Sequence, residues 1–289
     1  MDTGRRTATA TLRGLLDLTR LGNAIAAGVL TFTGAFVAQG FEAAPLAIAA
    51  AVIATVCATA AGNAINDYFD RDIDRINRPD RPIPRGAISA RGTLVFSAAL
   101  FLSAVVAALT LPLAALAIAV ANLLALVAYT EVFKGLPAIG NVVVAYLTGS
   151  TFLFGAAAVG RLWNPAVLVL FALAALATVT REIVKDVEDL VGDREEGLRT
   201  LPIVIGESSA LRIAALVLLV AVGASAIPYL MGTFGLAYVV LVGAADAVMM
   251  DATRRSFSDP SVAQRRLKRG MFLAAVGFVA GRVAAGGFV

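Results

Sequence analysis

Long apolar runs recur along the whole chain and are separated by short polar segments. An α-helix crosses a bilayer with about 20 apolar residues, and nine runs reach or approach that length. We expect spans at Leu21–Val37, Pro45–Ile65, Thr93–Thr110, Pro112–Ala128, Ala138–Val159, Ala166–Val179, Leu211–Leu230, Leu236–Met250 and Met271–Gly287. Several runs are short or merge, so eight spans is the alternative. The pattern predicts an all-α integral membrane protein with about nine transmembrane helices.

Composition excludes a soluble domain and several kinds of site. Of the 289 residues, 59% are hydrophobic and 15% are charged, against about 25% charged in soluble proteins. The chain has no histidine and one cysteine, Cys57, within an apolar run. These counts exclude histidine-based catalysis, histidine–metal sites and an internal disulfide.

Arginine and lysine concentrate in alternate polar segments. With nine spans, these segments fall on one side, which the positive-inside rule assigns to the cytoplasm. The segment Thr253–Gly270 is strongly basic, and we expect it to lie on the lipid surface. The net charge of +4 suits anionic lipid headgroups and phosphates; it requires no nucleic acid, and no obligatory protein partner is evident. We therefore expect a multi-pass protein of the cell membrane.

An acidic cluster follows the apolar run Pro45–Ile65. Asp70 and Asp74 are four residues apart, with Asn66 one helical turn earlier, so all three share one helix face. Like charges at this spacing repel, and a bound cation would remove the conflict. Oxygen-only ligands suit Mg²⁺, which proteins bind with one or two carboxylates plus substrate phosphates. Asp67 and Asp72 point to other faces, and we expect them to be structural or to pair with Arg71 or Arg75.

A second cluster repeats the first about 120 residues later. Asp189 and Asp193 have the same spacing, and a proline and a glycine follow each cluster at matching positions. We interpret this as a weak internal repeat. It makes the chain one transmembrane domain, 1–289, with two halves at roughly 12–130 and 138–289. Facing carboxylate pairs could hold Mg²⁺ ions and a diphosphate between them.

Basic and polar residues near both clusters are candidates for binding phosphate. Arginine binds phosphate in a bidentate manner, and three prolines restrict the segment Asn77–Gly86 to a rigid, non-helical loop. Ordinary alternatives are a basic membrane-surface loop, snorkelling of Lys134 and an interhelical hydrogen bond from Asn23. The substrate-binding candidates are Asn23, Asn66, Arg78, Arg81, Arg85, Tyr129, Lys134, Arg181 and Arg199, with Lys185 beside the second cluster.

The paired motifs resemble those of the UbiA superfamily of intramembrane prenyltransferases. The resemblance rests on Asn66–Asp74 with the following Asn77–Gly86 loop, on Asp186–Asp193, and on Tyr129–Lys134, and it spans nearly the whole chain. It departs at Gly135, where the family often has a basic residue. It implies a nine-helix bundle around a central cavity, Mg²⁺ dependence and a polyprenyl diphosphate donor. Asp70, Asp74, Asp189, Asp193 and Lys185 would be catalytic, and Asn66 with the four aspartates would bind the metal.

Within the superfamily, the uninterrupted run Asn63–Asp70, the loop and the compact second motif look most like the archaeal enzymes that form the second ether bond of membrane lipids. Those enzymes transfer a geranylgeranyl group to geranylgeranylglyceryl phosphate, a lipid-like acceptor. The acceptor phosphate would then need its own basic partner, for which Arg81, Arg85 and Arg199 are candidates.

Three alternatives remain open from the sequence. An aromatic acid or quinone precursor could be the acceptor instead. The second alternative is a metal-ion or phosphate transporter. A transporter would carry its acids near the membrane midplane, whereas the acids of this chain cluster at the cytoplasmic ends of the spans. The third alternative is a CDP-alcohol phosphotransferase, which is also membrane-bound and rich in acids, but the characteristic aspartate-rich run of that class is absent here.

Overall fold

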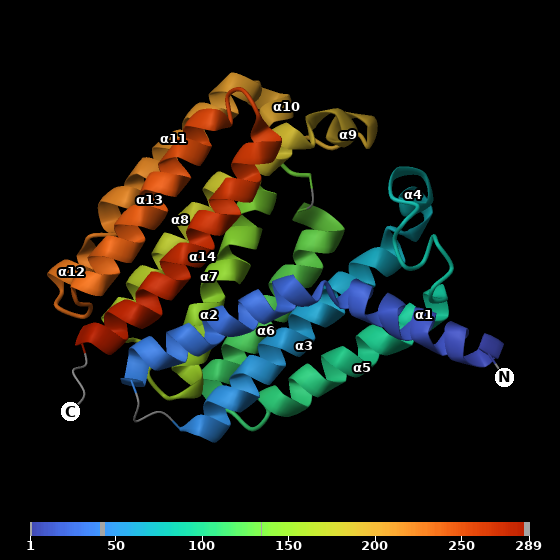
Figure 1. Ribbon diagram of the computed structural model, residues 1–289, viewed down its shortest axis with the longest axis horizontal. Helices are drawn as coiled ribbons and strands as arrows, with labels where there is room; N and C mark the ends of the chain where they lie inside the picture. Colours follow the sequence, from blue (N-terminus) through green and yellow to red (C-terminus); the bar gives the residue numbers. More distant parts are fainter. Residues whose placement is uncertain (1, 41–43, 134, 286–289) are drawn as a thin grey trace.

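The chain folds into a bundle of long helices (Figure 1), seen in a computed structural model that describes residues 2–40, 44–133 and 135–285. No strand occurs in these ranges. The elements are α1 (Asp2–Thr19), α2 (Leu21–Gln39), α3 (Pro45–Phe69), α4 (Arg71–Asn77), α5 (Ala90–Ala108), α6 (Leu113–Ala128), the π-helix η2 (Tyr129–Phe133), α7 (Ile139–Ala158), α8 (Pro165–Glu188), α9 (Leu190–Glu195), α10 (Leu201–Ile205), α11 (Glu207–Ala224), α12 (Ile227–Leu230), α13 (Leu236–Arg255) and α14 (Pro260–Ala285).

The long helices confirm the predicted membrane architecture. Each expected span coincides with one of α2, α3, α5, α6, α7, α8, α11 with α12, α13 or α14. In the described part of the chain, seven helices are long and apolar enough to cross a membrane, counting α11 through α12 as one. The other two are α6, which has 16 residues, and α14, which begins with a basic segment. The chain is an all-helical integral membrane protein, and nine is an approximate number of spans.

Two predicted boundaries were wrong for the same physical reason. Helix α8 continues past Val179 to Glu188, and α14 begins at Pro260 rather than Met271. The segment Thr253–Gly270 is therefore mostly helical, with Ala263 and Leu267 buried. Charged residues on one face of a helix do not end it when small apolar residues continue on the other face.

The N-terminal helix α1 was not expected from the sequence. It joins α2 at Arg20, whose φ of 44° lies in the left-handed region and separates the two helices. The side chain of Asn63 on α3 donates a hydrogen bond to the Thr19 carbonyl at 2.9 Å. Figure 1 shows α1 running along the α3 and α5 side of the bundle.

Helices α2 and α7 cross at two glycines. A Cβ atom built on Gly155 would lie far inside contact distance of the Thr31 carbonyl oxygen, and one built on Gly34 would overlap the backbone of Phe152. Small residues allow such close backbone approach, which stabilises membrane helix pairs through packing. Near the C-terminal end of α2, Asn164 links α2 to α8. Its side chain caps the start of α8 and donates a hydrogen bond to the Ala38 carbonyl of α2 at 3.2 Å.

We predict that Gly155→Ala destabilises the protein by at least the roughly 1–3 kcal/mol typical of overpacking, because the added methyl group meets backbone that cannot move independently. Thermal unfolding of the purified protein in detergent would measure the loss. Gly243→Ala on α13 is the matched control, because nothing lies within 4 Å of its added Cβ. Equal midpoints for the two variants would contradict the tight crossing.

Candidate active site

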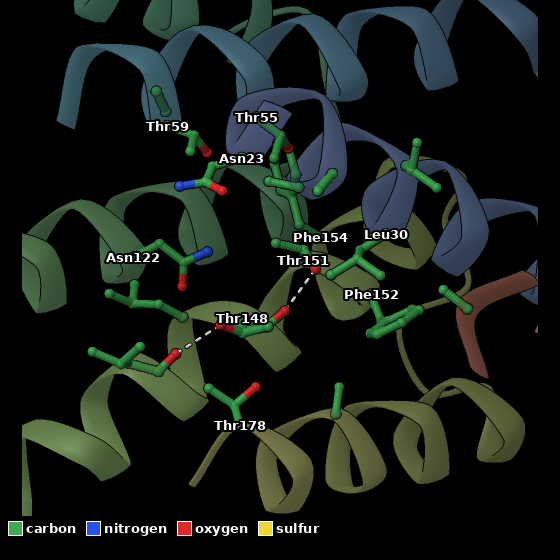
Figure 2. Close-up of a pocket in the computed structure, with 18 of the residues that line it drawn as sticks. Asn23, Leu30, Thr55, Thr59, Asn122, Thr148, Thr151, Phe152, Phe154 and Thr178 are labelled. Atoms are coloured by element: carbon green, nitrogen blue, oxygen red, sulfur yellow. Dashed lines mark hydrogen bonds between the residues drawn. The ribbon is translucent and has the colours of Figure 1, made fainter. Parts of the chain in front are cut away.

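A cavity of about 580 Å³ lies inside the bundle. Its lining comes mainly from α2, α3, α5, α6, α7, α8, α13 and α14, and most of the lining residues are alanine, leucine, valine or phenylalanine. Figure 2 shows Leu30, Phe152 and Phe154 facing this space together with several threonines. Two of these, Thr148 and Thr151, donate their hydroxyl hydrogens to carbonyls of their own helix, so they present a largely apolar surface. Such a cavity suits a hydrocarbon chain.

The polar lining gathers toward one end of the cavity. Asn23 lies near the start of α2, Asn66 near the end of α3 and Arg181 in the last third of α8, while Lys268 lies in the first half of α14. By chain direction, these are the helix ends next to α4 and α9, which lie at the same end of the bundle in Figure 1. Deeper in the cavity, Asp246 accepts a hydrogen bond from the Ser225 hydroxyl at 2.8 Å, which supplies a partner that the sequence did not reveal.

The first acidic motif lies at a helix break. Helix α3 ends at Phe69 and α4 begins at Arg71, with Asp70 between them at φ −80° and ψ 1°. Hydrogen bonds from Asp70 N–H to the Asn66 carbonyl and from Asp74 N–H to the Asp70 carbonyl continue the helical pattern. The break therefore bends the chain without losing the one-turn spacing of Asn66, Asp70 and Asp74.

Two arginines neutralise the buried acids of this motif. Asp67 is 4% exposed and Asp74 is 5% exposed. Arg81 contacts Asp67 at 3.0 Å and Oδ2 of Asp74 at 2.7 Å, and Arg20 contacts Asp67 at 2.7 Å. A buried carboxylate needs such partners. Asp67 was expected to be structural or to pair with Arg71 or Arg75, and it is a buried structural residue whose partners are Arg20 and Arg81. Asp72 pairs with Arg75 as expected.

The second acidic motif has the same local geometry. Helix α8 ends at Glu188 and α9 begins at Leu190, with Asp189 between them at φ −89° and ψ 4°. This is the sparsely populated bridge region of backbone space, which is common at active sites. The Asp193 N–H bonds the Asp189 carbonyl at 2.9 Å, as Asp74 bonds Asp70. The two motifs share a helix break at corresponding aspartates, Asp70 and Asp189.

The side chains around the second motif are closely coupled. Lys185 lies 3.7 Å from Asp189, and Asn141 of α7 donates to Asp186 at 2.8 Å. Arg181 pairs with the adjacent Glu182. Burial raises the pKa of the Asp193 carboxyl above its ordinary value, and a bound cation would counter that effect.

The remaining candidates take three kinds of position. Arg78 and Arg199 are exposed, while Arg85 pairs with Asp17 of α1 at 2.5 Å. Tyr129 begins η2, a π-helical turn of a kind often found at functional sites, and the Arg199 N–H bonds the Gly135 carbonyl just beyond it at 2.9 Å. Lys134 lies outside the described residues.

The donor atoms at these breaks fit Mg²⁺ shared with a substrate. They are carboxylate and amide oxygens, which hard cations prefer. In the described ranges, no three acidic, histidine or cysteine side chains come close enough to form a complete metal site. One or two carboxylates would then serve each ion, with phosphate oxygens completing the coordination. The Arg81 contact to Asp74 would have to rearrange if both Asp74 oxygens bound metal.

Lys268 is the main cavity residue that sequence reasoning missed. It lies within a run of basic residues, Arg265, Arg266, Lys268 and Arg269, which is typical of a lipid surface. Continuing the helical period of the last span backwards would have found it. Lys268, Met271, Phe272 and Ala275 all line the cavity at the i, i+3, i+4, i+7 spacing of one helix face.

Comparisons with known proteins agree in sequence and in fold. A model described as the UbiA prenyltransferase family matches residues 27–276. The chain is similar to the digeranylgeranylglyceryl phosphate synthase of Haloquadratum walsbyi, with 63% identity over 282 residues and 98% of each chain covered. It is also similar to the synthase of the same name from Natronomonas pharaonis, with 65% identity over 273 residues, covering 94% of this chain and 98% of the relative.

Solved structures show the same architecture. One, from work on digeranylgeranylglyceryl phosphate synthase in membranes, has a TM-score of 0.79 and 35% identity and covers 95% of this chain and 99% of its own. A UbiA homologue from Archaeoglobus fulgidus, bound to DMAPP and Mg²⁺, has a TM-score of 0.71 and covers 95% of this chain and 99% of its own. Its 18% identity makes that second likeness one of fold.

Proposed function

Because the chain belongs to the UbiA prenyltransferase family, we propose that it transfers a geranylgeranyl group from geranylgeranyl diphosphate to the free hydroxyl of geranylgeranylglyceryl phosphate. This reaction forms the second ether bond of archaeal membrane lipids. The observation that carries the proposal is an apolar cavity whose polar end leads toward two acidic helix breaks. The acceptor follows from relatives of that name at 63% and 65% identity over nearly the whole chain.

The donor diphosphate would bind between the two breaks. Asn66, Asp70, Asp74, Asp189 and Asp193 would hold Mg²⁺, which when bound neutralises charge on the leaving diphosphate. The Archaeoglobus fulgidus homologue bound to DMAPP and Mg²⁺ has the same fold, which supports a prenyl diphosphate held with Mg²⁺ in this architecture. Lys185, next to Asp189, would donate to a phosphate oxygen as negative charge builds there. Arg78, Tyr129 and Lys134 are further candidates for the same diphosphate, which leaves the cavity for the prenyl tail.

The cavity would position the reacting atoms and limit the access of water. The bond between the allylic carbon and the diphosphate breaks, with its electron pair going to the diphosphate. The acceptor hydroxyl oxygen then bonds that carbon and loses its proton to a carboxylate or to the released diphosphate, because the chain has no histidine to accept it. Apolar walls protect the allylic cation from hydrolysis.

We also propose that the active site faces the cytoplasm and that the molecule is one domain made of two related halves. Orientation is supported by basic residues on the segments next to both acidic breaks. The repeat is supported by the nearly equal backbone angles at Asp70 and Asp189.

The direct test is product identification. We predict that the purified protein with Mg²⁺ and labelled geranylgeranyl diphosphate converts geranylgeranylglyceryl phosphate to a diether lipid. 4-Hydroxybenzoate, offered in parallel, should be a far poorer acceptor. A preference for the aromatic acceptor would refute the ether-lipid assignment and leave the prenyltransferase activity standing.

Single replacements of Asp70, Asp189 and Asp193 by alanine, and of Asp74 by asparagine, which can still accept a hydrogen bond from Arg81, should each lower turnover strongly without unfolding the protein. Each residue would contribute to metal-bound charge on the leaving group, a contribution often worth roughly a hundredfold or more. Asp72→Ala is the control, because Asp72 is exposed and pairs only locally with Arg71 and Arg75. Full activity in any two of the four variants would refute the site.

Orientation is testable by cysteine labelling in a Cys57→Ala background. Glu196 follows α9, and Trp163 lies between α7 and α8; both are exposed. We predict that Glu196→Cys reacts with a membrane-impermeant maleimide only in inside-out vesicles, and Trp163→Cys only in intact cells. Labelling of both positions from one side would contradict the proposed topology.

A further inference from the structure

We propose that Lys268, together with Asn23 and Arg181, binds the phosphate of the acceptor lipid at a site separate from the donor diphosphate. The inference rests on the proposed function and assigns the acceptor headgroup to a definite place. It replaces Arg81, Arg85 and Arg199 as acceptor-phosphate candidates, since none of these three lines the cavity.

Lys268 is exposed, lines the cavity, and has no carboxylate partner among the described residues. Its ammonium donates to Oδ1 of Asn23 at 3.0 Å, and an amide is neutral. Within the described ranges, no carboxylate lies at ion-pair distance from Lys268, whereas Arg20, Arg81, Arg85 and Arg266 all have one. The Asn23 contact holds the ammonium at the cavity lining, which both residues form. A phosphate there would gain a charge-assisted hydrogen bond.

Arg181 supplies a second cationic group to the cavity lining, on α8, which packs against α14. It is paired with Glu182, but its Nε is buried and has no hydrogen-bond partner. Three residues earlier on α8, the hydroxyl oxygen of Thr178 is also buried and unpartnered, in a side chain only 1% exposed. Both residues line the cavity. Buried polar atoms without partners are costly, and an anionic oxygen from a ligand would satisfy the Arg181 donor.

The position suits the second substrate rather than the first. Arg181 precedes Asp189 by eight residues on α8, a rise of about 12 Å. A phosphate bound at Arg181 would therefore lie apart from a diphosphate at Asp189. On α14, Met271 and Phe272 continue the cavity wall next to Lys268, where the acceptor's own tail would lie.

The test compares Lys268→Gln, Lys268→Arg and Arg265→Gln in lipid nanodiscs without anionic lipid. Arg265 is a matched control, since it is exposed like Lys268 and bonds an uncharged side chain, the Ser261 hydroxyl on its own helix, but does not line the cavity. We expect Lys268→Gln to raise the KM for geranylgeranylglyceryl phosphate roughly ten- to a hundredfold. The donor KM should not change, and Lys268→Arg should retain most of the affinity.

Geranylgeranylglycerol, the same acceptor without its phosphate, isolates the interaction. Its KM should be the same in wild type and in Lys268→Gln. Calorimetric titration of both acceptors without donor or Mg²⁺ should repeat the contrast as a binding measurement independent of turnover. If Lys268→Gln weakened the binding of both acceptors equally, Lys268 would act through the structure or through contact with the acceptor tail, and the proposed phosphate site would be overturned.

Other outcomes separate the remaining explanations. An increase in donor KM would place Lys268 at the donor site and refute the inference. Unchanged acceptor binding, with Lys268→Gln and Arg265→Gln equally weakened toward anionic vesicles, would assign Lys268 to bulk lipid headgroups. A wild-type protein that makes no diether product would refute the proposed function, whereas phosphate-dependent acceptor binding lost in Lys268→Gln would still support the site.

Discussion

The pairing of buried carboxylates with arginine is the interaction on which this end of the molecule depends. Asp67 and Asp74 lie where the bundle meets the polar segments, with little access to water. Because Arg81 contacts both acids while Arg20 contacts Asp67, one network joins α3, α4, the following loop and the α1–α2 junction. An uncompensated charge in this environment would cost several kcal/mol. Through Arg81, the carboxylates of Asp67 and Asp74 hold the loop that follows α4 against the end of α3.

The two halves of the molecule use charge differently. In the first half, the acids are largely paired with arginines, and Asp72 is exposed. In the second half, the acids lie near Lys185 and the amide of Asn141, so less of their charge is compensated. The two equal helix breaks therefore lie beside chemically unequal sets of carboxylates. A diphosphate bound between the two breaks would have arginine-paired acids on one side. On the other side, the acids have fewer cationic partners, and a bound cation would stabilise them more.

Much of the fold was predictable because membrane spans are determined by local composition. The nine apolar runs, the proline-restricted loop after Asn77 and the non-helical turn at Leu111 and Pro112 all match the structure. The helix α1 and the early start of α14 were missed, because each is a helix with one polar face that resembles a surface segment. Four-residue spacing predicted the acidic motifs, but no spacing could show that Arg81 contacts Asp67, since that pairing depends on how the loop folds back.

The exposed outer wall of the cavity has a consequence for affinity. Helices α5 and α6 line the cavity with Val105, Val120 and Leu123 and expose Leu102, Val106 and Leu124, which do not line it, so a single layer of helices separates the cavity from lipid there. A prenyl chain that moves from bilayer to cavity exchanges one hydrocarbon solvent for another and gains little hydrophobic free energy, just as helices gain little by associating in lipid. Recognition in such a protein therefore depends on the headgroup, and the tails mainly determine whether a ligand fits.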